Sequence, residues 1–462
     1  MIAKALFFLL VVLSVAFLLS SLRRREGVFE FPTLFAGAFL FSIVPQLINH
    51  VFYPGRLPAK VYEDHGVEYG LIMCILCLVA GIASYRGTPR VRRETTLWRI
   101  DVDRLFRAGV ALYLVGTFGA LKLAALSGGL REQFTEGGHY ALEWSGAPVI
   151  WSYVSKLLPF GLLLCLNSVL IRGSLWKWTV VVLMTLYPLA VIVFLGRRAM
   201  VFRLALIVFI SVWFQRRWTP PRWLCLTGMA LGGMCIILAP SYRTYANQTG
   251  DIRGALRQAD MQSAVEKYAM GERGEGIENL IIGIPARLSY LSFSWGSGFW
   301  NGMIAYWVPG QIVGYRLKQG LMLRIGAGDD EVFWKYCGLG FAPGGAFSTG
   351  PYSAFREFGF FGCLLFFMMG RFYRWLWHLA AKRRSLGAQV FYVSFALAVP
   401  MAVVTSVLLA FDLLLLSVVA VVPALWLIRE RQPTLVPCPP VSDPYMRWPQ
   451  SLRRCTRPSP FH

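Results

Sequence analysis

Eleven runs of mostly apolar residues alternate with short polar segments along the chain. Each run is close to the ~20 residues that an α-helix needs to cross a bilayer. A helix satisfies its own backbone hydrogen bonds in lipid, so this pattern predicts a bundle of membrane-spanning helices. The runs cover residues 5–22, 31–51, 69–85, 108–126, 148–171, 178–196, 199–215, 223–240, 354–370, 388–409 and 411–428.

Lysine and arginine gather in the polar segments that follow every second run. These basic segments are 23–25, 86–107, 172–177, 216–222, 371–384 and the chain from 429 onward. Basic residues beside membrane spans stay on the cytoplasmic side, and a single orientation satisfies all six segments. We therefore predict that the N-terminus lies outside and the C-terminus inside.

The net charge of +22 would suggest a nucleic-acid partner if the chain were an ordinary globular protein. The hydrophobic content of 56% instead indicates a membrane protein, whose cationic loops face anionic lipid on the inner side. The outer segment 241–353 holds ten Lys/Arg and nine Asp/Glu and is close to neutral. We expect membrane lipids as partners and no nucleic acid.

The sequence divides into four parts. Residues 1–240 hold the first eight predicted helices and 354–428 the last three, so together they form the membrane domain. Between them, residues 241–353 are too long for a structureless loop and should fold into short helices that cap the membrane domain. The tail 429–462 contains eight prolines and is predicted to be a disordered cytoplasmic segment. The expected fold class is all-α, a polytopic integral membrane protein with about 11 transmembrane helices and one large periplasmic loop domain.

Several cations break the charge rule. Arg197 and Arg198 lie between the sixth and seventh runs, on the predicted outer side, and Arg203 lies about one turn deeper. Lys156 falls inside the fifth run. A cation at membrane depth is costly and indicates a functional cavity, although a long side chain can also reach the headgroups. Arginine binds phosphate through two parallel hydrogen bonds, so we expect an anionic lipid head near Arg197 and Arg198.

Metal and cofactor binding are not expected. The histidines, at positions 50, 65, 139, 378 and 462, form no pair with ligand spacing. Cys74 and Cys77 match a C-x-x-C spacing but fall within a predicted span without acidic or histidine partners, which favours ordinary packing.

The chain resembles the O-antigen or oligosaccharide repeat-unit polymerases of the Wzy type. The similar parts are the outer segment 127–140, Gly196-Arg197-Arg198 between two spans, Tyr242-Arg243 at the start of the large loop, and 352–362 at the entry to the ninth span. Some members also carry an arginine followed eleven positions later by glycine in their outer loops. Arg243–Gly254 and Arg287–Gly298 have that spacing here.

The resemblance implies a bacterial inner-membrane glycosyltransferase that joins polyprenyl-pyrophosphate-linked oligosaccharide repeat units on the periplasmic face. Such enzymes serve O-antigen, capsule or exopolysaccharide synthesis, and a chain-length regulator protein would be a further partner. Pyrophosphate is a good leaving group, so positioned cations should supply most of the catalysis without a metal. Arg197 and Arg198 are the first choice for this role.

Other residues are candidates for supporting roles. His139 and Glu357 are candidates for a general base, although His139 has an ordinary loop position and Glu357 could simply pair with a neighbouring arginine. The remaining substrate-binding candidates are Arg203, Arg243, Arg287, Arg356, Lys156, Trp295 and Trp300. The two tryptophans could stack on sugars or anchor at the membrane interface.

Two alternatives remain open at this point. An O-antigen ligase is disfavoured because segment 241–353 contains no histidine. A lipid-linked oligosaccharide flippase or other transporter should show paired halves and charges near the midplane, whereas the unusual cations lie towards the outer side.

Overall fold

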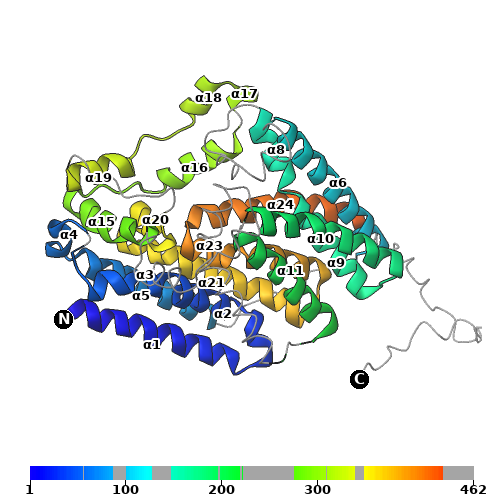
Figure 1. Ribbon diagram of the computed structural model, residues 1–462, viewed down its shortest axis with the longest axis horizontal. Coiled ribbons are helices and arrows are strands. Elements are labelled where there is room, and N and C mark those ends of the chain that lie inside the picture. Colours follow the sequence, from blue (N-terminus) through cyan, green and yellow to red (C-terminus); the bar gives the residue numbers. More distant parts are fainter. Residues whose placement is uncertain are drawn as a thin grey trace, which may run out of the picture.

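The computed structural model describes residues 1–55, 57–86, 100–126, 147–195, 198–218, 221, 275–308, 310–338 and 348–429. Helices make up most of these residues, and the single strand-like pairing among them is the isolated bridge between Ile100 and Arg429. The predicted all-α class is therefore confirmed for the described chain (Figure 1).

Eight helical stretches of the described chain are long and apolar enough to cross a membrane. They correspond to the first five and the last three predicted runs, so the chain is a multi-pass membrane protein. The stretches are α1 (Ile2–Leu22); Phe31–Phe52, made of α2 (Phe31–Ala38), η2 (Phe39–Ile43) and α3 (Val44–Phe52); α5 (Gly66–Arg86); α6 (Val102–Leu126); Ile150–Ile171, from α8 (Ala147–Ser155) and α9 (Leu158–Ile171); Gly350–Lys382, from α20 (Gly350–Phe358), η3 (Gly359–Gly362), α21 (Cys363–Trp377) and η4 (His378–Lys382); Leu386–Val404, from α22 (Leu386–Ala396) and α23 (Ala398–Val404); and α24 (Val407–Ile428).

The sixth and seventh predicted runs are also helical. They form α10 (Leu175–Leu195), with a shorter apolar stretch, and α11 (Arg198–Arg216), which carries Arg203. The eighth run, 223–240, lies outside the described residues. The total of eleven spans therefore stays a prediction.

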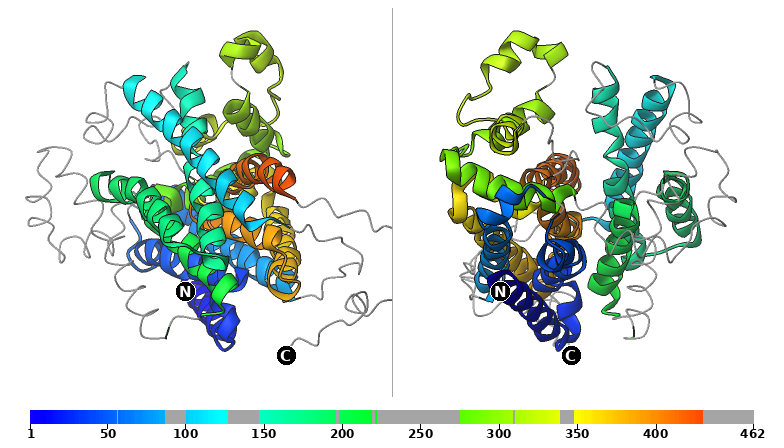
Figure 2. Two further views of the ribbon diagram at one scale, coloured as in Figure 1. Left: turned by 90° about the vertical axis from the view of Figure 1, so that its right-hand side faces the viewer. Right: turned by 60° about the vertical axis from the view of Figure 1, so that its left-hand side comes forward.

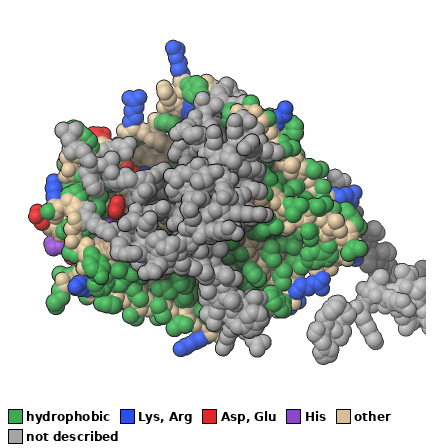
Figure 3. Space-filling view, viewed as in Figure 1, with side chains coloured by type: hydrophobic (Ala, Val, Ile, Leu, Met, Phe, Trp, Pro, Cys, Tyr) green, Lys and Arg blue, Asp and Glu red, His purple; other side chains and the backbone are tan. Residues whose placement is uncertain are grey.

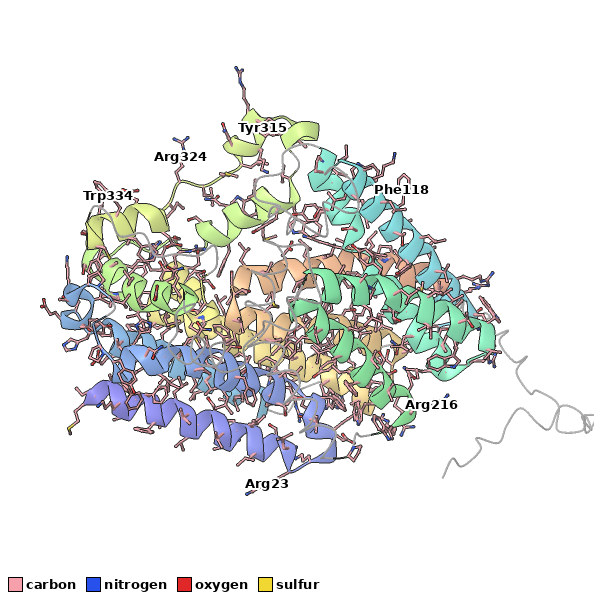
Figure 4. The ribbon with its side chains drawn as sticks, in the orientation of Figure 1. Arg23, Phe118, Arg216, Tyr315, Arg324 and Trp334 are labelled. Atoms are coloured by element: carbon pink, nitrogen blue, oxygen red, sulfur yellow. The ribbon has the colours of Figure 1, made fainter. Side chains whose placement is uncertain are left out.

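The described helices share two common ends. At one end, which we call the basic end, the contacts include Lys177–Asp103 at 2.6 Å and Gln215–Gln389 at 3.0 Å. At the opposite end, Tyr336 donates to Asp64 at 2.6 Å. In Figure 4, Arg23 and Arg216 lie along the lower edge, and Tyr315, Arg324 and Trp334 along the upper edge. The basic end contains residues 23–30, 100–103, 168–177, 215–217, 380–389 and 428–429; the opposite end contains 52–55, 57–65, 290–308, 310–338, 349–358 and 405–407.

Two contacts show at which end of the bundle the first and last described residues lie. Phe7 packs edge to face on Phe52, which places the N-terminal end of α1 at the opposite end, whereas Arg429 pairs with Ile100 at the basic end. Residues 1 and 429 therefore lie at different ends of the bundle. Hydrophobic side chains cover much of the lower and right-hand surface between these ends (Figure 3).

Small residues set the closest helix contacts. A Cβ atom on Gly161 of α9 would lie 2.6 Å from the backbone nitrogen of Tyr113 on α6. A Cβ atom on Gly370 of α21 would collide with the carbonyl oxygen of Gly81 on α5. Membrane helices depend on such close packing, because lipid tails are as apolar as leucine and provide no hydrophobic drive for helices to associate. In Figure 2, α6 and α8–α11 form a group beside the remaining helices.

Short helices lie at the opposite end of the bundle, and all of them except α4 come from segment 241–353. They are α4 (Ala59–Glu63), α15 (Glu275–Tyr290), α16 (Ser297–Trp307), α17 (Gly310–Val313), α18 (Tyr315–Gly320) and α19 (Asp329–Cys337). The α15 helix packs on the first turns of α5, where a Cβ on Gly66 would collide with the Ile281 carbonyl. Figure 1 shows α16–α19 along the upper side of the bundle.

Candidate functional site

The α20 helix brings three polar side chains to the opposite end of the bundle. Its N-terminus is capped by the Thr349 hydroxyl, which accepts the Tyr352 amide at 3.4 Å, and it ends at Gly359, whose φ of 58° suits glycine. Tyr352 and Arg356 are four residues apart and therefore lie on one face of the helix. Glu357 follows directly and is fully buried.

Four charged side chains, Arg287, Asp329, Arg356 and Glu357, form a continuous network that we call the charge ladder. Arg287 donates to Asp329 at 2.6 Å, and Arg356 donates to the other oxygen of Asp329 at 3.0 Å. Arg356 also donates to Glu357 at 3.0 Å from Nε and lies 2.9 Å from it through Nη2. Two cations and two anions alternate, so the ladder is neutral as a whole. The expected pairing of Glu357 with a neighbouring arginine is present.

Glu357 also holds the start of α16. One carboxylate oxygen accepts the backbone N–H groups of Gly296 at 3.0 Å and Gly298 at 3.1 Å. The first amides of a helix have no partner within the helix and carry a partial positive charge, so a carboxylate stabilises them. A side chain on Gly298 would collide with this carboxylate. Arg287 and Gly298 are eleven residues apart in sequence. Arg287 is part of the charge ladder, and the Gly298 amide donates to its Glu357 member.

Arg287 is fully buried, and each guanidinium nitrogen has a partner. Besides Asp329, it donates to the Ser292 carbonyl at 2.6 Å and to the Tyr352 hydroxyl at 3.3 Å. Tyr352 in turn donates to Asp329 at 2.6 Å. These contacts place Arg287 as a residue that orders the outer segment, and all three of its guanidinium nitrogens already donate within the protein.

The positive charges of two arginines keep the Asp329 carboxyl ionised. Burial alone would raise the pKa of this carboxyl, but the guanidiniums of Arg356 and Arg287 hold it below its usual range. For Arg287, burial lowers the pKa, and Tyr352 and Asp329 more than offset that effect. Asp329 and Arg287 are therefore both charged near neutral pH.

Two tryptophans predicted to bind substrate lie beside the ladder and are accessible. The Trp295 amide donates to the Glu357 carbonyl at 2.9 Å, while its side chain is 67% exposed. Trp295 has a φ of 50°, a left-handed conformation that costs a non-glycine residue roughly 1–2 kcal/mol. The Trp300 side chain is 44% exposed and donates from Nε1 to the Leu321 carbonyl at 2.8 Å. Both aromatic rings face solvent or lipid.

Lys156 lies where the fifth span is interrupted between α8 and α9, with Pro159 at the start of α9. Its ammonium is 3.9 Å from Asp412 on α24 and 4.1 Å from the centre of the Tyr153 ring. Lys156 therefore has a buried acidic partner on another membrane helix.

Arg203 lies on α11, with its guanidinium 5.5 Å from the centre of the Phe160 ring. It lines a small cavity between α9, α11 and α22, with a volume near 10 Å³, room for about one water. Among the described residues, no carboxylate or other hydrogen-bonding group pairs with Arg203.

Asp329 and Asp412 were missed by the sequence reasoning. Asp412 and Glu357 are the two acidic residues inside the eleven predicted runs, and this rarity could have marked Asp412. Asp329 is the first acidic residue after Glu278, and fifty residues without an acid separate the two. Only the fold shows that Asp329 forms ion pairs with Arg287 and Arg356.

The remaining candidates lie outside the description. Arg197, His139 and Arg243 are among residues that the structure does not describe, and Arg198 is described only as the first residue of α11. Among the described residues, no group of three histidine, cysteine or acidic side chains is placed to hold a metal ion. No family model, curated protein or solved structure matches the chain.

Proposed function

We propose that the chain is a membrane glycan polymerase that joins polyprenyl-pyrophosphate-linked oligosaccharide repeat units at the outer face of the bacterial inner membrane. The observation that carries this proposal is Arg203, a guanidinium on α11, the helix of the seventh predicted run, that has no acidic partner among the described residues. An uncompensated cation at this depth is costly and calls for an anionic ligand. The anion available there is a lipid phosphate or pyrophosphate.

Geometry on the same helix adds to this argument. Arg198 begins α11, and Arg203 follows five residues later, about 7.5 Å along the axis at ~1.5 Å per residue. Both arginines thus lie in the first half of α11, which we place in the outer part of the membrane. A pyrophosphate linked to a polyprenyl chain would lie at this depth. The cavity beside Arg203 has room for about one water, so we expect α9, α11 or α22 to move apart when the lipid binds.

The proposed chemistry is a glycosyl transfer. A hydroxyl oxygen of the incoming repeat unit attacks the anomeric carbon of the growing glycan, the bond from that carbon to pyrophosphate breaks, and the hydroxyl proton is lost. Arginines beside the pyrophosphate stabilise the negative charge that develops on it as it leaves. The charge ladder would act at a distance by holding Trp295 and Trp300 at the outer surface, where aromatic rings can stack on sugars.

Arg203→Ala tests the proposal. In cells that lack the wild-type chain, we expect this variant to reduce polymer formation by ~10²–10³-fold, because a charge-assisted contact in a dry site is lost. Arg203→Lys should restore activity only in part, since an ammonium keeps the charge without the planar fork. Arg197→Ala and Arg198→Ala should behave like Arg203→Ala. Gel electrophoresis of the glycan measures chain length.

Arg216→Ala is the matched control, because Arg216 is an exposed residue in the last turn of the same helix, at the basic end. It should leave the polymer unchanged, and immunoblotting should show equal amounts of all variants in the membrane. Wild-type chain lengths from Arg203→Ala would refute the role of this arginine. Accumulation of repeat units on the inner face would instead indicate a flippase, and loss of transfer to a final acceptor alone would indicate a ligase.

A further inference from the structure

A second polar cluster lies deeper than the charge ladder, where α8 meets α9, α16 and the start of α24. The contacts run from Asp412 to Lys156 at 3.9 Å, from Lys156 to the Tyr153 ring at 4.1 Å, and from that ring to the Trp307 ring at 5.6 Å between centres. Tyr306 precedes Trp307 in the last turn of α16. We call these five residues the α24 cluster.

The hydrogen-bonding groups of this cluster are not satisfied by one another. Asp412 has a buried side chain, and its Oδ1 atom has no hydrogen-bond partner. The Nε1 donor of Trp307 is also buried and without a partner. Among the described residues, the hydroxyls of Tyr153 and Tyr306 accept or donate no hydrogen bond either. Buried polar groups normally find partners, so the two buried atoms without one, Asp412 Oδ1 and Trp307 Nε1, indicate a ligand.

The chemistry of these groups identifies the kind of ligand. Asp412 and Lys156 cancel each other's charge, so the α24 cluster is neutral and does not favour an anion. It offers a carboxylate acceptor, an indole donor and two phenol groups beside aromatic faces, which suits a ring with several hydroxyl groups. The side chain of Lys156 is 36% exposed and Tyr306 is 41% exposed, so the cluster is open on one side.

We infer that the α24 cluster is the subsite for a sugar ring of the lipid-linked saccharide, adjacent to a phosphate subsite at Arg203. This inference rests on the proposed function. Arg203 lies 5.5 Å from the centre of the Phe160 ring, and Phe160 is four residues from Lys156, so the two subsites are neighbours, as a sugar and the pyrophosphate attached to it must be. Asp412 accepts a sugar hydroxyl, and Trp307 and Tyr306 donate to ring or hydroxyl oxygens. The uncompensated cation and the neutral cluster thus recognise different parts of one molecule.

Binding of two probes to the full chain in lipid nanodiscs tests the inference. One probe is undecaprenyl pyrophosphate without sugar, and the other is the saccharide-bearing lipid extracted from cells that lack this chain. Asp412→Asn should weaken binding of the saccharide-bearing lipid by about 10- to 100-fold, because a hydrogen bond to a charged group is lost. Binding of the sugar-free lipid should not change. Tyr306→Phe should show the same selectivity with a smaller loss, about 3- to 10-fold for a neutral hydrogen bond.

Matched controls separate this effect from loss of structure. Asp103→Asn removes a carboxylate that pairs with Lys177 at the basic end, and Tyr290→Phe removes a hydroxyl of the outer segment that donates to the Lys335 carbonyl. Neither should alter binding of either probe. Asp412→Asn leaves Lys156 without a partner, so the double variant Asp412→Asn/Lys156→Met, which removes both charges, is measured as well.

The outcomes are distinct. Equal losses for both probes, or no loss for either in Tyr306→Phe and the double variant, would overturn the sugar subsite while leaving the polymerase proposal intact. If the wild-type chain binds neither probe, the proposed function itself fails and the sugar subsite with it. Selective loss of the saccharide-bearing lipid supports both.

Discussion

Gly298 is a residue where a single methyl group should disturb the outer segment. A Cβ atom there collides with the Glu357 carboxylate that caps α16. Overpacking of this kind should lower the free energy of unfolding by about 1–3 kcal/mol. We expect Gly298→Ala to lower the thermal unfolding midpoint of the purified protein. Gly320→Ala is the control, because no atom lies within 4 Å of its Cβ position. Equal midpoints for the two variants would show that the cap is not tight.

Asp329 should make the outer segment sensitive to acid. Its pKa is lowered from the usual 3.8 by Arg356 and Arg287 against the effect of burial. A carboxyl whose pKa is lower in the folded state contributes its stability above its unfolded pKa, and this stability is lost as the pH falls through the folded value. Hydrogen exchange of residues 275–338 should therefore accelerate below about pH 4.

The variant Asp329→Asn isolates this effect. It removes the titrating group, so the exchange of the same residues should be faster at neutral pH and should lose its acid-dependent step. An unchanged step in Asp329→Asn would assign the acid sensitivity to other carboxyls.

At the scale of helices, the close packing of α6 on α9 predicts that Gly161 cannot be replaced by a larger residue without loss of stability. Its Cβ position is 2.6 Å from a backbone nitrogen of α6, and backbone cannot rotate away as a side chain can. Gly161→Ala should separate the two helices and destabilise the membrane domain by about 1–3 kcal/mol. Loss of ellipticity during titration with a denaturing detergent measures this change.

Gly387 of α22 provides the comparison. The nearest atom to its Cβ position is 3.5 Å away, an ordinary contact, so Gly387→Ala should unfold with the wild-type profile. If Gly161→Ala also unfolds with that profile, the helices have room to separate without loss.

Spans could be predicted from the sequence because each is a local property of about 20 residues, and eight of the predicted runs are helices of the required length. The interruption at Lys156 was not predicted, since a tertiary contact with Asp412 of α24 accompanies it. The charge ladder was foreseen only at its sequence-adjacent pair, Arg356 and Glu357. Asp329 and Arg287 join it through contacts between distant segments, which no local pattern encodes.

For the whole molecule, the orientation of the bundle relative to the two sides of the membrane can be tested. The basic end should face the cytoplasm, because lysine and arginine beside spans are retained there. A phosphatase reporter that is active only outside the cytoplasm should be active when fused after Gly320. A fluorescent protein that folds only in the cytoplasm should be bright when fused after Arg429. The reverse pair of signals would invert the assignment.

Arg356 and Glu357 are neighbours in sequence but bind different parts of the outer segment, α19 and α16 respectively. The chain then turns at Gly359 and continues as membrane helix α21. Because Trp295 and the start of α16 are bonded to Glu357, a shift of α21 should also move Trp295 and Trp300. We therefore expect the surface proposed to meet the glycan to move together with the membrane domain.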